Sequence, residues 1–269
     1  MPNISVIVTT YNRPDALALV LKALAAQTKP PFEVIIADDG STNSTAELIK
    51  ELCPQLPYSL QHIWQEDKGF RAAMARNRAV IAATGDYLIF LDGDSIPRTD
   101  FIAKHAQLAE KGCFVAGNRI LLSKKFTAQL KSPIWTWTTR QWLIPYLRRD
   151  INRFLPLIRL PERKKNKKQK WQGAKTCNLA IWRDDFIKIN GFDESFQGWG
   201  HEDAELVVRL LRNGVQRKEG RFAVPVLHLW HPEEDRSNEK DNRQRLEQIL
   251  RSTKKVAEQG INQDSLNEN

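Results

Sequence analysis

Apolar and polar residues alternate along the first part of the chain in blocks that fit strands and amphipathic helices by turns. Short continuous apolar runs indicate buried strands, and apolar residues at a helical period indicate helices. The runs predict strands at 4–8, 32–37, 60–64 and 87–91. Helical spacing predicts helices between them at 15–26, 44–52 and 70–83. Repeated β-α units predict an α/β fold with a mostly parallel, Rossmann-like sheet and helices on both faces.

The alternation breaks down between residues 121 and 170, where tryptophans and basic residues form an insertion without a clear period. Regular spacing returns at Trp171. Apolar periodicity, with a glycine after each helix, predicts helices at 183–189 and 202–212. A strand at 222–227 and a polar helical tail at 233–258 are expected to follow. A chain of 269 residues suffices for one domain that carries such an insertion.

Composition narrows the class of protein. Hydrophobic residues make up 41% and charged residues 27%, which is ordinary for a soluble globular protein. No apolar stretch approaches the roughly 20 residues that cross a bilayer, and the N-terminus lacks the pattern of a secretory signal. The odd and widely spaced Cys53, Cys113 and Cys177 fit a reducing compartment. We therefore expect a cytoplasmic protein.

The net charge of +9 is concentrated in the insertion. A basic run at 163–170 follows an aromatic stretch at 134–147. Basic residues beside Trp and Tyr favour an anionic membrane surface, where the rings lie at headgroup level. Nucleic acid is the other anionic partner to consider. A solvated loop remains the simpler alternative, since charge runs are often only that.

Asp92-Gly93-Asp94 directly follows the apolar run at 87–91. Two carboxylates at the end of a buried strand lie at the carboxyl edge of the sheet, where open α/β sheets bind ligands. Such oxygen ligands suit Mg²⁺ or Mn²⁺ that bridges to a substrate's phosphates. A plain turn is the alternative, because Asp and Gly are common turn residues.

Two other strand ends carry polar groups, around Thr9 and Tyr11 and at Asp39. Parallel strand ends gather at one edge of the sheet, so these groups should converge with the carboxylates. No glycine-rich loop follows the first strand, which argues against a dinucleotide or P-loop site. Asp39 suits a base or a sugar, unless it caps the helix that follows. Arg71 and Arg76 suit a diphosphate, unless they form a solvated helix face.

Trp199 lies between two glycines, a costly position for packing alone, and suits stacking on the apolar face of a sugar. Glu202 and Asp203 then open a helix. Asp203 shares the apolar stripe of that helix, so its carboxylate should point inward and could act as a general base. An acidic residue is favourable at a helix N-terminus for electrostatic reasons alone, and this simpler explanation fits Glu202 better than Asp203. Further on, His228 or His231 could complete a metal site that favours Mn²⁺, or be an ordinary half-buried histidine.

Taken together, the motifs resemble the inverting glycosyltransferases of family 2, which have the GT-A fold. The matching segments are 5–14, 38–41 and 92–94 in the first half, with 191–194 and 198–203 in the second. The second half looks like the galactosyltransferase type, which bacterial chondroitin polymerase and animal galactosyltransferases share. The insertion has no counterpart in this resemblance. His201 departs from the pattern, which often has glycine there.

The resemblance implies a nucleotide-diphosphate sugar donor, usually UDP-linked, and Mn²⁺ or Mg²⁺ as cofactor. The implied donor site comprises Thr9, Tyr11, Asp39, Arg71, Arg76, Asp92 and Gly93, in which Tyr11 and Asp39 hold the base. Asp94 is the implied main metal ligand, with Asp92 and with His231 or His228. Asp203 is the implied base, and Trp199 with Glu202 would contact the acceptor.

The implied parts are a nucleotide-sugar half at 1–118, the insertion at 119–170, an acceptor half at 171–232 and a tail at 233–269. The expected function is transfer of a sugar to a glycan or glycolipid of a bacterial surface polysaccharide, capsule or lipopolysaccharide, peripheral on the cytosolic face of the inner membrane and without a nucleic-acid partner. Two alternatives stay open. One is a polyprenyl-phosphate glycosyltransferase of the same fold, and the other is a non-catalytic module that binds anionic lipid or nucleic acid.

Overall fold

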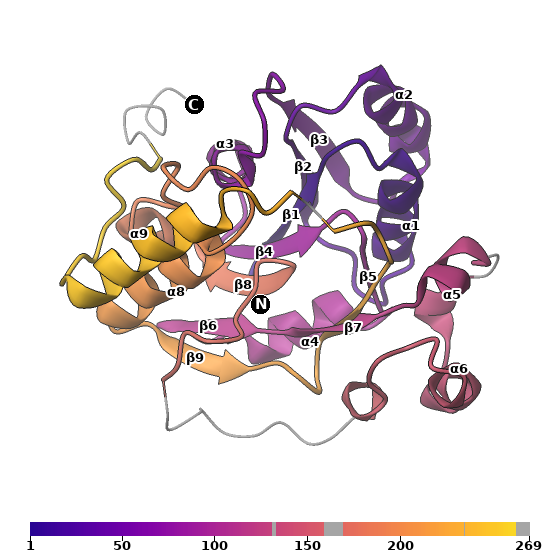
Figure 1. The fold of residues 1–269 in the computed structure, drawn as a ribbon. Helices are drawn as coiled ribbons and strands as arrows, with labels where there is room; N and C mark the ends of the chain where they lie inside the picture. The colour runs from indigo at the N-terminus through magenta and orange to yellow at the C-terminus, as the bar shows by residue number, and fades with distance from the viewer. Residues whose placement is uncertain (131–132, 159–168, 234, 262–269) are drawn as a thin grey trace.

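The computed structural model describes residues 1–130, 133–158, 169–233 and 235–261. A seven-stranded, mostly parallel sheet in the order β3-β2-β1-β4-β8-β6-β9 runs through the molecule, and helices cover both of its faces (Figure 1). Apolar residues of α1, α2 and α4 pack on one face, and those of α3, α7 and α8 pack on the other. The predicted fold class is confirmed.

The first seven elements follow the sequence pattern closely. The strands are β1 (Ile4–Thr10), β2 (Glu33–Asp38), β3 (Ser59–Trp64) and β4 (Tyr87–Asp92), and all pair in parallel. The helices are α1 (Pro14–Ala25), α2 (Asn43–Leu52) and α3 (Ala72–Ala82), with a short 3₁₀ turn η1 (Cys53–Gln55) after α2. Their predicted positions are confirmed, with strand and helix ends that differ by at most two residues.

The far side of the sheet contains elements that the sequence pattern does not predict. These are α4 (Phe101–Leu108), β6 (Cys113–Ala116), β8 (Asn178–Trp182) and β9 (Gln216–Glu219). β8 runs antiparallel to both β4 and β6, so residues from the second half of the chain enter the middle of the sheet. Helices α7 (Arg183–Lys188) and α8 (Glu202–Arg212) form as predicted.

A second, three-stranded sheet in the order β5-β10-β7 lies beside the first. It comprises β5 (Ser95–Pro97), β10 (Pro225–His228) and β7 (Asn118–Leu121). The strand expected at 222–227 is corrected to Pro225–His228, because the chain turns at 220–224 through a hydrogen bond from Val224 N to Gly220 O. Since β5 starts directly after Asp94, its pairing with β10 brings the C-terminal part of the chain to the Asp-Gly-Asp segment.

The described part of the insertion is folded onto the core, contrary to its irregular appearance in the sequence. It forms α5 (Lys124–Ala128), η2 (Ile134–Thr136), η3 (Thr139–Trp142), α6 (Leu143–Leu147) and η4 (Leu155–Leu157). Trp142 is fully buried, with the ring centroid of Trp137 at 4.9 Å. The expectation that this aromatic stretch lies at a membrane surface is therefore wrong for Trp142. Of the basic run, residues 163–168 lie outside the described residues. Among the described helices, none is both long and apolar enough to cross a bilayer.

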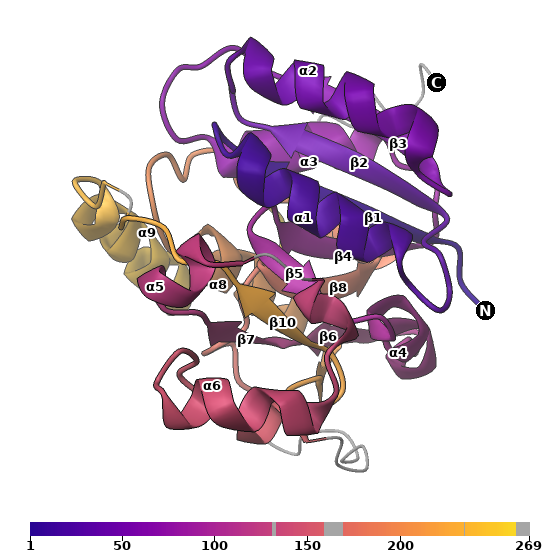
Figure 2. The same cartoon turned by 90° about the vertical axis from the view of Figure 1, so that its right-hand side faces the viewer.

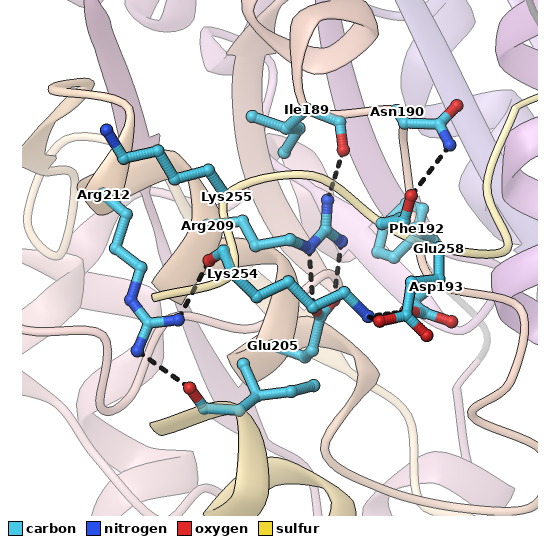
Figure 3. Close-up of polar contacts among 12 residues, drawn as sticks. Ile189, Asn190, Phe192, Asp193, Glu205, Arg209, Arg212, Lys254, Lys255 and Glu258 are labelled. Atoms are coloured by element: carbon cyan, nitrogen blue, oxygen red, sulfur yellow. Dashed lines mark hydrogen bonds and ion pairs between the residues drawn. The ribbon is translucent and has the colours of Figure 1, made fainter. Parts of the chain in front are cut away.

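The tail forms a shorter helix than predicted, α9 (Glu239–Arg251), which packs against α8. After α9 the chain returns along the loop that follows α7, and polar contacts fasten it there (Figure 3). Lys254 Nζ pairs with a carboxylate oxygen of Asp193 at 2.9 Å, and Arg212 donates to the carbonyl oxygen of Lys254 at 2.9 Å. The helix predicted to reach residue 258 ends at Arg251, and the chain beyond it bonds to the end of α7 instead, through Ala257 N to Ile189 O and Ile261 N to Asn190 O.

Candidate active site

Arg76 joins the two halves of the candidate site. It lies on α3 with 4% of its surface exposed, and its guanidinium is 3.2 Å from Glu202 and 3.5 Å from Asp92. Its Nε donates to Thr9 Oγ1 at 3.0 Å. Thr9 and Asp92 are register partners at the ends of β1 and β4. The predicted convergence of strand ends is thus observed for these two, and Arg76 extends it to the start of α8.

Asp94, His228 and His231 form a second cluster, in which one ligand atom from each lies within 4.8 Å of the others. Asp94 carboxylate oxygens lie 3.5 Å from His228 Nε2 and 3.4 Å from His231 Nε2. The pairing of β5 with β10 positions this cluster, since His228 is the register partner of Ser95 and Leu229 N donates to Asp94 O.

The backbone orients both rings. His228 Nδ1 is 2.8 Å from Leu229 O, and His231 Nδ1 is 2.6 Å from Pro232 O. A nitrogen that close to a carbonyl oxygen donates to it, which leaves Nε2 of each ring facing Asp94. One carboxylate and two imidazoles suit Mn²⁺ better than Mg²⁺.

Asp92 and Gly93 are the other two residues of the predicted Asp-Gly-Asp segment. Burial, together with the neighbouring Asp94 charge, raises the pKa of Asp92, while Arg76 opposes that rise. Gly93 N donates to Thr9 O at 2.7 Å, and a Cβ on Gly93 would lie only 3.0 Å from that oxygen. The tight approach to β1 therefore explains glycine at this position.

Asp39 does not cap α2, since Thr42 occupies the N-cap position. Its buried carboxylate accepts from Arg71 N at 2.7 Å and from Gln65 Nε2 at 2.6 Å, and burial raises its pKa. The Arg71 guanidinium donates to Glu66 O, so of the two arginines only Arg76 is brought to Asp92.

Tyr11 is half exposed at the end of β1, and its hydroxyl donates to Asp67 at 2.8 Å. That hydrogen bond and burial raise the pKa of the Tyr11 phenol. The ring lies in the same region as Asp39, whose charge also contributes to the raised pKa. Tyr11 and Asp39 are thus neighbours, as their predicted shared role requires.

Asp203 lies in the first turn of α8, next to Glu202. Burial and the Glu202 charge raise the pKa of Asp203 to about 7, although Lys175 and Arg76 oppose the rise. Burial raises the pKa of the Cys177 thiol most, and the charges of Asp92, Asp203 and Asp94 raise it further. Cys177 is therefore within electrostatic reach of both motifs. A pKa near neutrality is what a general base requires.

Trp199 is held in its loop by the tail of the chain. Asn242 Nδ2 on α9 lies 3.0, 3.4 and 3.5 Å from the carbonyl oxygens of Gln197, Gly198 and Trp199. Gly198 has a φ of 76°, and a Cβ there would lie 2.5 Å from Asn238. The Arg236 guanidinium lies 4.6 Å from the centroid of the Trp199 ring. The glycine thus serves close packing as well as the position of the ring.

Lys175, Arg119 and Cys177 lie within electrostatic reach of the site without having been predicted. The Lys175 charge lowers the pKa of Asp203 and the Arg119 charge lowers that of Asp92, while burial and the carboxylate charges raise the pKa of Cys177. Lys175 and Cys177 lie in the irregular stretch before β8, and Arg119 lies on the short β7. Neither stretch has a periodic signal in the sequence, so only the pairing of β7 and β8 in three dimensions identifies these residues.

Comparison with known families identifies the family of this chain. The model described as glycosyl transferase family 2 matches residues 5–189. The chain belongs to this family. A second model, described as the N-terminal domain of galactosyltransferase, matches residues 160–231. The glycosyltransferase fold expected from the motifs is confirmed, and the chain is a transferase by family.

Characterised relatives of this glycosyltransferase are longer proteins. Validoxylamine A glucosyltransferase of Streptomyces hygroscopicus subsp. limoneus is 30% identical over 241 residues, which cover 80% of this chain and 49% of that one. Chondroitin synthase of Escherichia coli is 26% identical over 230 residues, covering 78% of this chain and 32% of the other. The chain thus spans about half or less of the length of these relatives.

Solved structures agree on the fold. The mannosyltransferase PcManGT of Pyrobaculum calidifontis, in complex with GDP-mannose and Mn²⁺, has a TM-score of 0.58 at 21% identity, covering 84% of this glycosyltransferase and 56% of PcManGT. Residues 1–349 of TarS from S. aureus, in complex with UDP, have a TM-score of 0.58 at 16% identity, covering 86% and 61%. At such identities the likeness concerns the fold alone.

Proposed function

We propose that this glycosyltransferase moves a sugar, with inversion, from a UDP-linked donor to a hydroxyl of a glycan or glycolipid acceptor. The observation that carries the proposal is Arg76, which bridges the Asp92 carboxylate at the end of β4 and Glu202 beside Asp203. The bridge brings a donor-side carboxylate and a candidate base with a pKa of about 7 to one centre.

The donor would lie across the carboxyl ends of β1, β2 and β4. Tyr11 and the buried Asp39 would hold the base, with Thr9 close to the nucleotide and Asp92 at the ribose. Gly93 lets the backbone come near the diphosphate, because no side chain intervenes. Arg76 offers a planar guanidinium that suits diphosphate oxygens, as does Arg71 after a change of rotamer.

Asp94, His228 and His231 would hold the metal ion. When bound, Mn²⁺ would stabilise the negative charge that develops on the departing diphosphate. The donor set fits that ion, because one carboxylate and two imidazole nitrogens lie within 4.8 Å of one another in a partly buried position. The complex of PcManGT with Mn²⁺ supports this choice of metal for the fold.

Asp203 would accept the proton of the acceptor hydroxyl while the oxygen of that hydroxyl attacks the anomeric carbon. The bond from that carbon to the donor's phosphate oxygen breaks on the opposite face, so one displacement inverts the centre. Trp199 would stack on the acceptor sugar, and Glu202 would both contact the acceptor and hold Arg76 in place. We place this reaction in the synthesis of a surface polysaccharide or lipopolysaccharide at the cytosolic face of a membrane.

The test is the Asp203→Asn variant. We expect turnover with a hydroxyl acceptor to fall about 10²–10⁴-fold, since that is the usual contribution of a general base. Binding of UDP with Mn²⁺, measured by calorimetry, should stay within a factor of two or so of the unmodified protein, because the amide keeps the shape of the site. Asp184→Asn is the matched control, since this exposed aspartate opens α7 and lies outside the site.

Two results would contradict the assignment. Normal turnover of Asp203→Asn with a hydroxyl acceptor would remove the base from this position. Normal turnover with polyprenyl phosphate alone would favour the alternative transferase, because an ionised acceptor needs no base. Steeply salt-dependent nucleic-acid binding without any nucleotide-sugar binding would favour a non-catalytic module.

A further inference from the structure

Helix α6 exposes apolar side chains that the core does not use. Four of its five residues are exposed by 46, 59, 44 and 79% in chain order: Leu143, Ile144, Tyr146 and Leu147. The inward side of this region is filled by Trp142 and Pro145, both buried. Leu155, in the nearby η4, is 65% exposed. Soluble surfaces rarely gather so many apolar side chains without a partner.

Basic residues flank this apolar surface along the chain. Arg148 and Arg149 directly follow α6, and the exposed Arg140 and Arg153 lie before and after it. Between residues 121 and 158 the sequence has one acidic residue, Asp150, and it accepts a hydrogen bond from Ser123 Oγ at 3.2 Å. The basic residues of the same stretch are Lys124, Lys125, Lys131, Arg140, Arg148, Arg149 and Arg153.

A groove lies between α6 and the end of β7, the strand that pairs with β10 and His228. Its volume is about 600 Å³, and it is lined among others by Leu121, Tyr146, Leu147 and Arg149. Leu121 is the register partner of His228, and Leu122 N donates to His228 O at 2.9 Å. Figure 2 shows α6 below β7 and β10 at the edge of the molecule. The exposed surface is thus one strand away from the site.

We propose that α6 with its flanking arginines docks on an anionic lipid bilayer, with the leucine and isoleucine side chains among the acyl chains near the headgroups. An apolar helix face bordered by Arg and Lys is the pattern of interfacial membrane helices. Nucleic acid would match the arginines but leave the aliphatic side chains in water, whereas a bilayer accommodates both. One consequence rests on the proposed function: an acceptor anchored in that bilayer would be presented on the side of the molecule where His228 and the candidate metal cluster lie.

The experiment is co-sedimentation of the full chain with phosphatidylcholine vesicles, with and without phosphatidylglycerol. We expect binding to the anionic vesicles, and at least about tenfold weaker binding for Ile144→Ser/Leu147→Ser because two buried aliphatic chains are lost. Arg148→Ser/Arg149→Ser should bind more weakly and with less dependence on salt. The matched control is Leu250→Ser/Val256→Ser, which removes two exposed aliphatic side chains at and after α9, 39 and 46% exposed. It should bind like the unmodified chain.

Several results would overturn the proposal. They are no binding to anionic vesicles, equal loss in the control variant, and loss in the arginine variant without loss in the Ile144/Leu147 variant, which would indicate a general polyanion site. Sedimentation that shows a dimer dissociated by Ile144→Ser/Leu147→Ser would assign the surface to a second copy of the chain. Binding is measured without donor or acceptor, and UDP binding of each variant is measured separately. A failed docking test therefore leaves the transferase assignment intact, and the reverse also holds.

Discussion

At the scale of single residues, the charge of Asp203 should control how kcat/KM for the acceptor depends on pH. A general base works only as the carboxylate, and burial with the adjacent Glu202 raises its pKa to about 7. We therefore expect kcat/KM for the acceptor to rise with pH up to about 7 and to fall about tenfold for each pH unit below it. Glu202→Gln removes the charge that raises the pKa, so this acidic limb should move to lower pH.

A pH-rate profile gives the pH at which activity falls on the acidic side (the acidic limb). That pH does not depend on how much absolute activity Glu202→Gln retains. Glu247→Gln is the control, because this carboxylate lies on the exposed side of α9, and its profile should match that of the unmodified chain. A limb that stays near 7 in Glu202→Gln would show that Glu202 does not set it. A flat profile down to pH 5 or so would show that no carboxylate of raised pKa acts as base.

At the scale of elements, α8 depends on a fully buried ion pair. Glu205 and Arg209 have no exposed side-chain surface, lie 2.5 Å apart, and Arg209 also donates to Ile189 O at 2.6 Å (Figure 3). Arg209→Met leaves Glu205 charged and unpaired, so the free energy of unfolding should fall by about 3–5 kcal/mol. The double variant Glu205→Leu/Arg209→Met should lose less, because no isolated charge remains.

Urea unfolding measures these differences. Arg243→Met serves as the control, since its pair with Glu247 at 3.7 Å is exposed, and its loss should be at most about 1 kcal/mol. Equal destabilisation by the single and the double variant would show that packing by Arg209, rather than the unpaired charge, determines the stability of α8.

Whether an element of the fold could be predicted depends on whether its sequence signal is local. Elements with apolar runs or a helical period, from β1 to β4 and in α8, were predicted because each of these patterns is local. β9 reads Gln-Arg-Lys-Glu and is a strand only because it pairs with β6, so no local signal exists. Likewise, Arg76 and Glu202 are 126 positions apart, and only the packing of α3 against α8 brings them together. Strand-end residues such as Asp92 were predictable, whereas their pairing partners were not.

At the scale of the whole molecule, the candidate site unites distant parts of the chain, because Thr9 and Asp94 come from the first part and His231 and Asp203 from the second. A ligand that contacts both parts binds only the folded state. UDP with Mn²⁺ at about a hundred times its Kd should therefore stabilise the protein by about 2.7 kcal/mol, which raises Tm by about 5–10 °C. A chelator should abolish the effect of the metal, and so should Asp94→Ala, while Asp184→Asn should keep it.

A thermal-shift panel of UDP, GDP and dTDP, each with and without Mn²⁺, then identifies the base. The largest shift should come from UDP with Mn²⁺, because Tyr11 and Asp39 are proposed to hold a uracil ring. A larger shift with GDP would correct the base and leave the transferase intact, whereas no shift with any nucleotide would remove the donor site. His231→Ala should lower the metal-dependent shift more than His201→Ala does, because Nε2 of His231 lies beside Asp94, whereas His201 lies at the N-cap of α8 outside the metal cluster. Equal effects of the two variants would place the metal elsewhere.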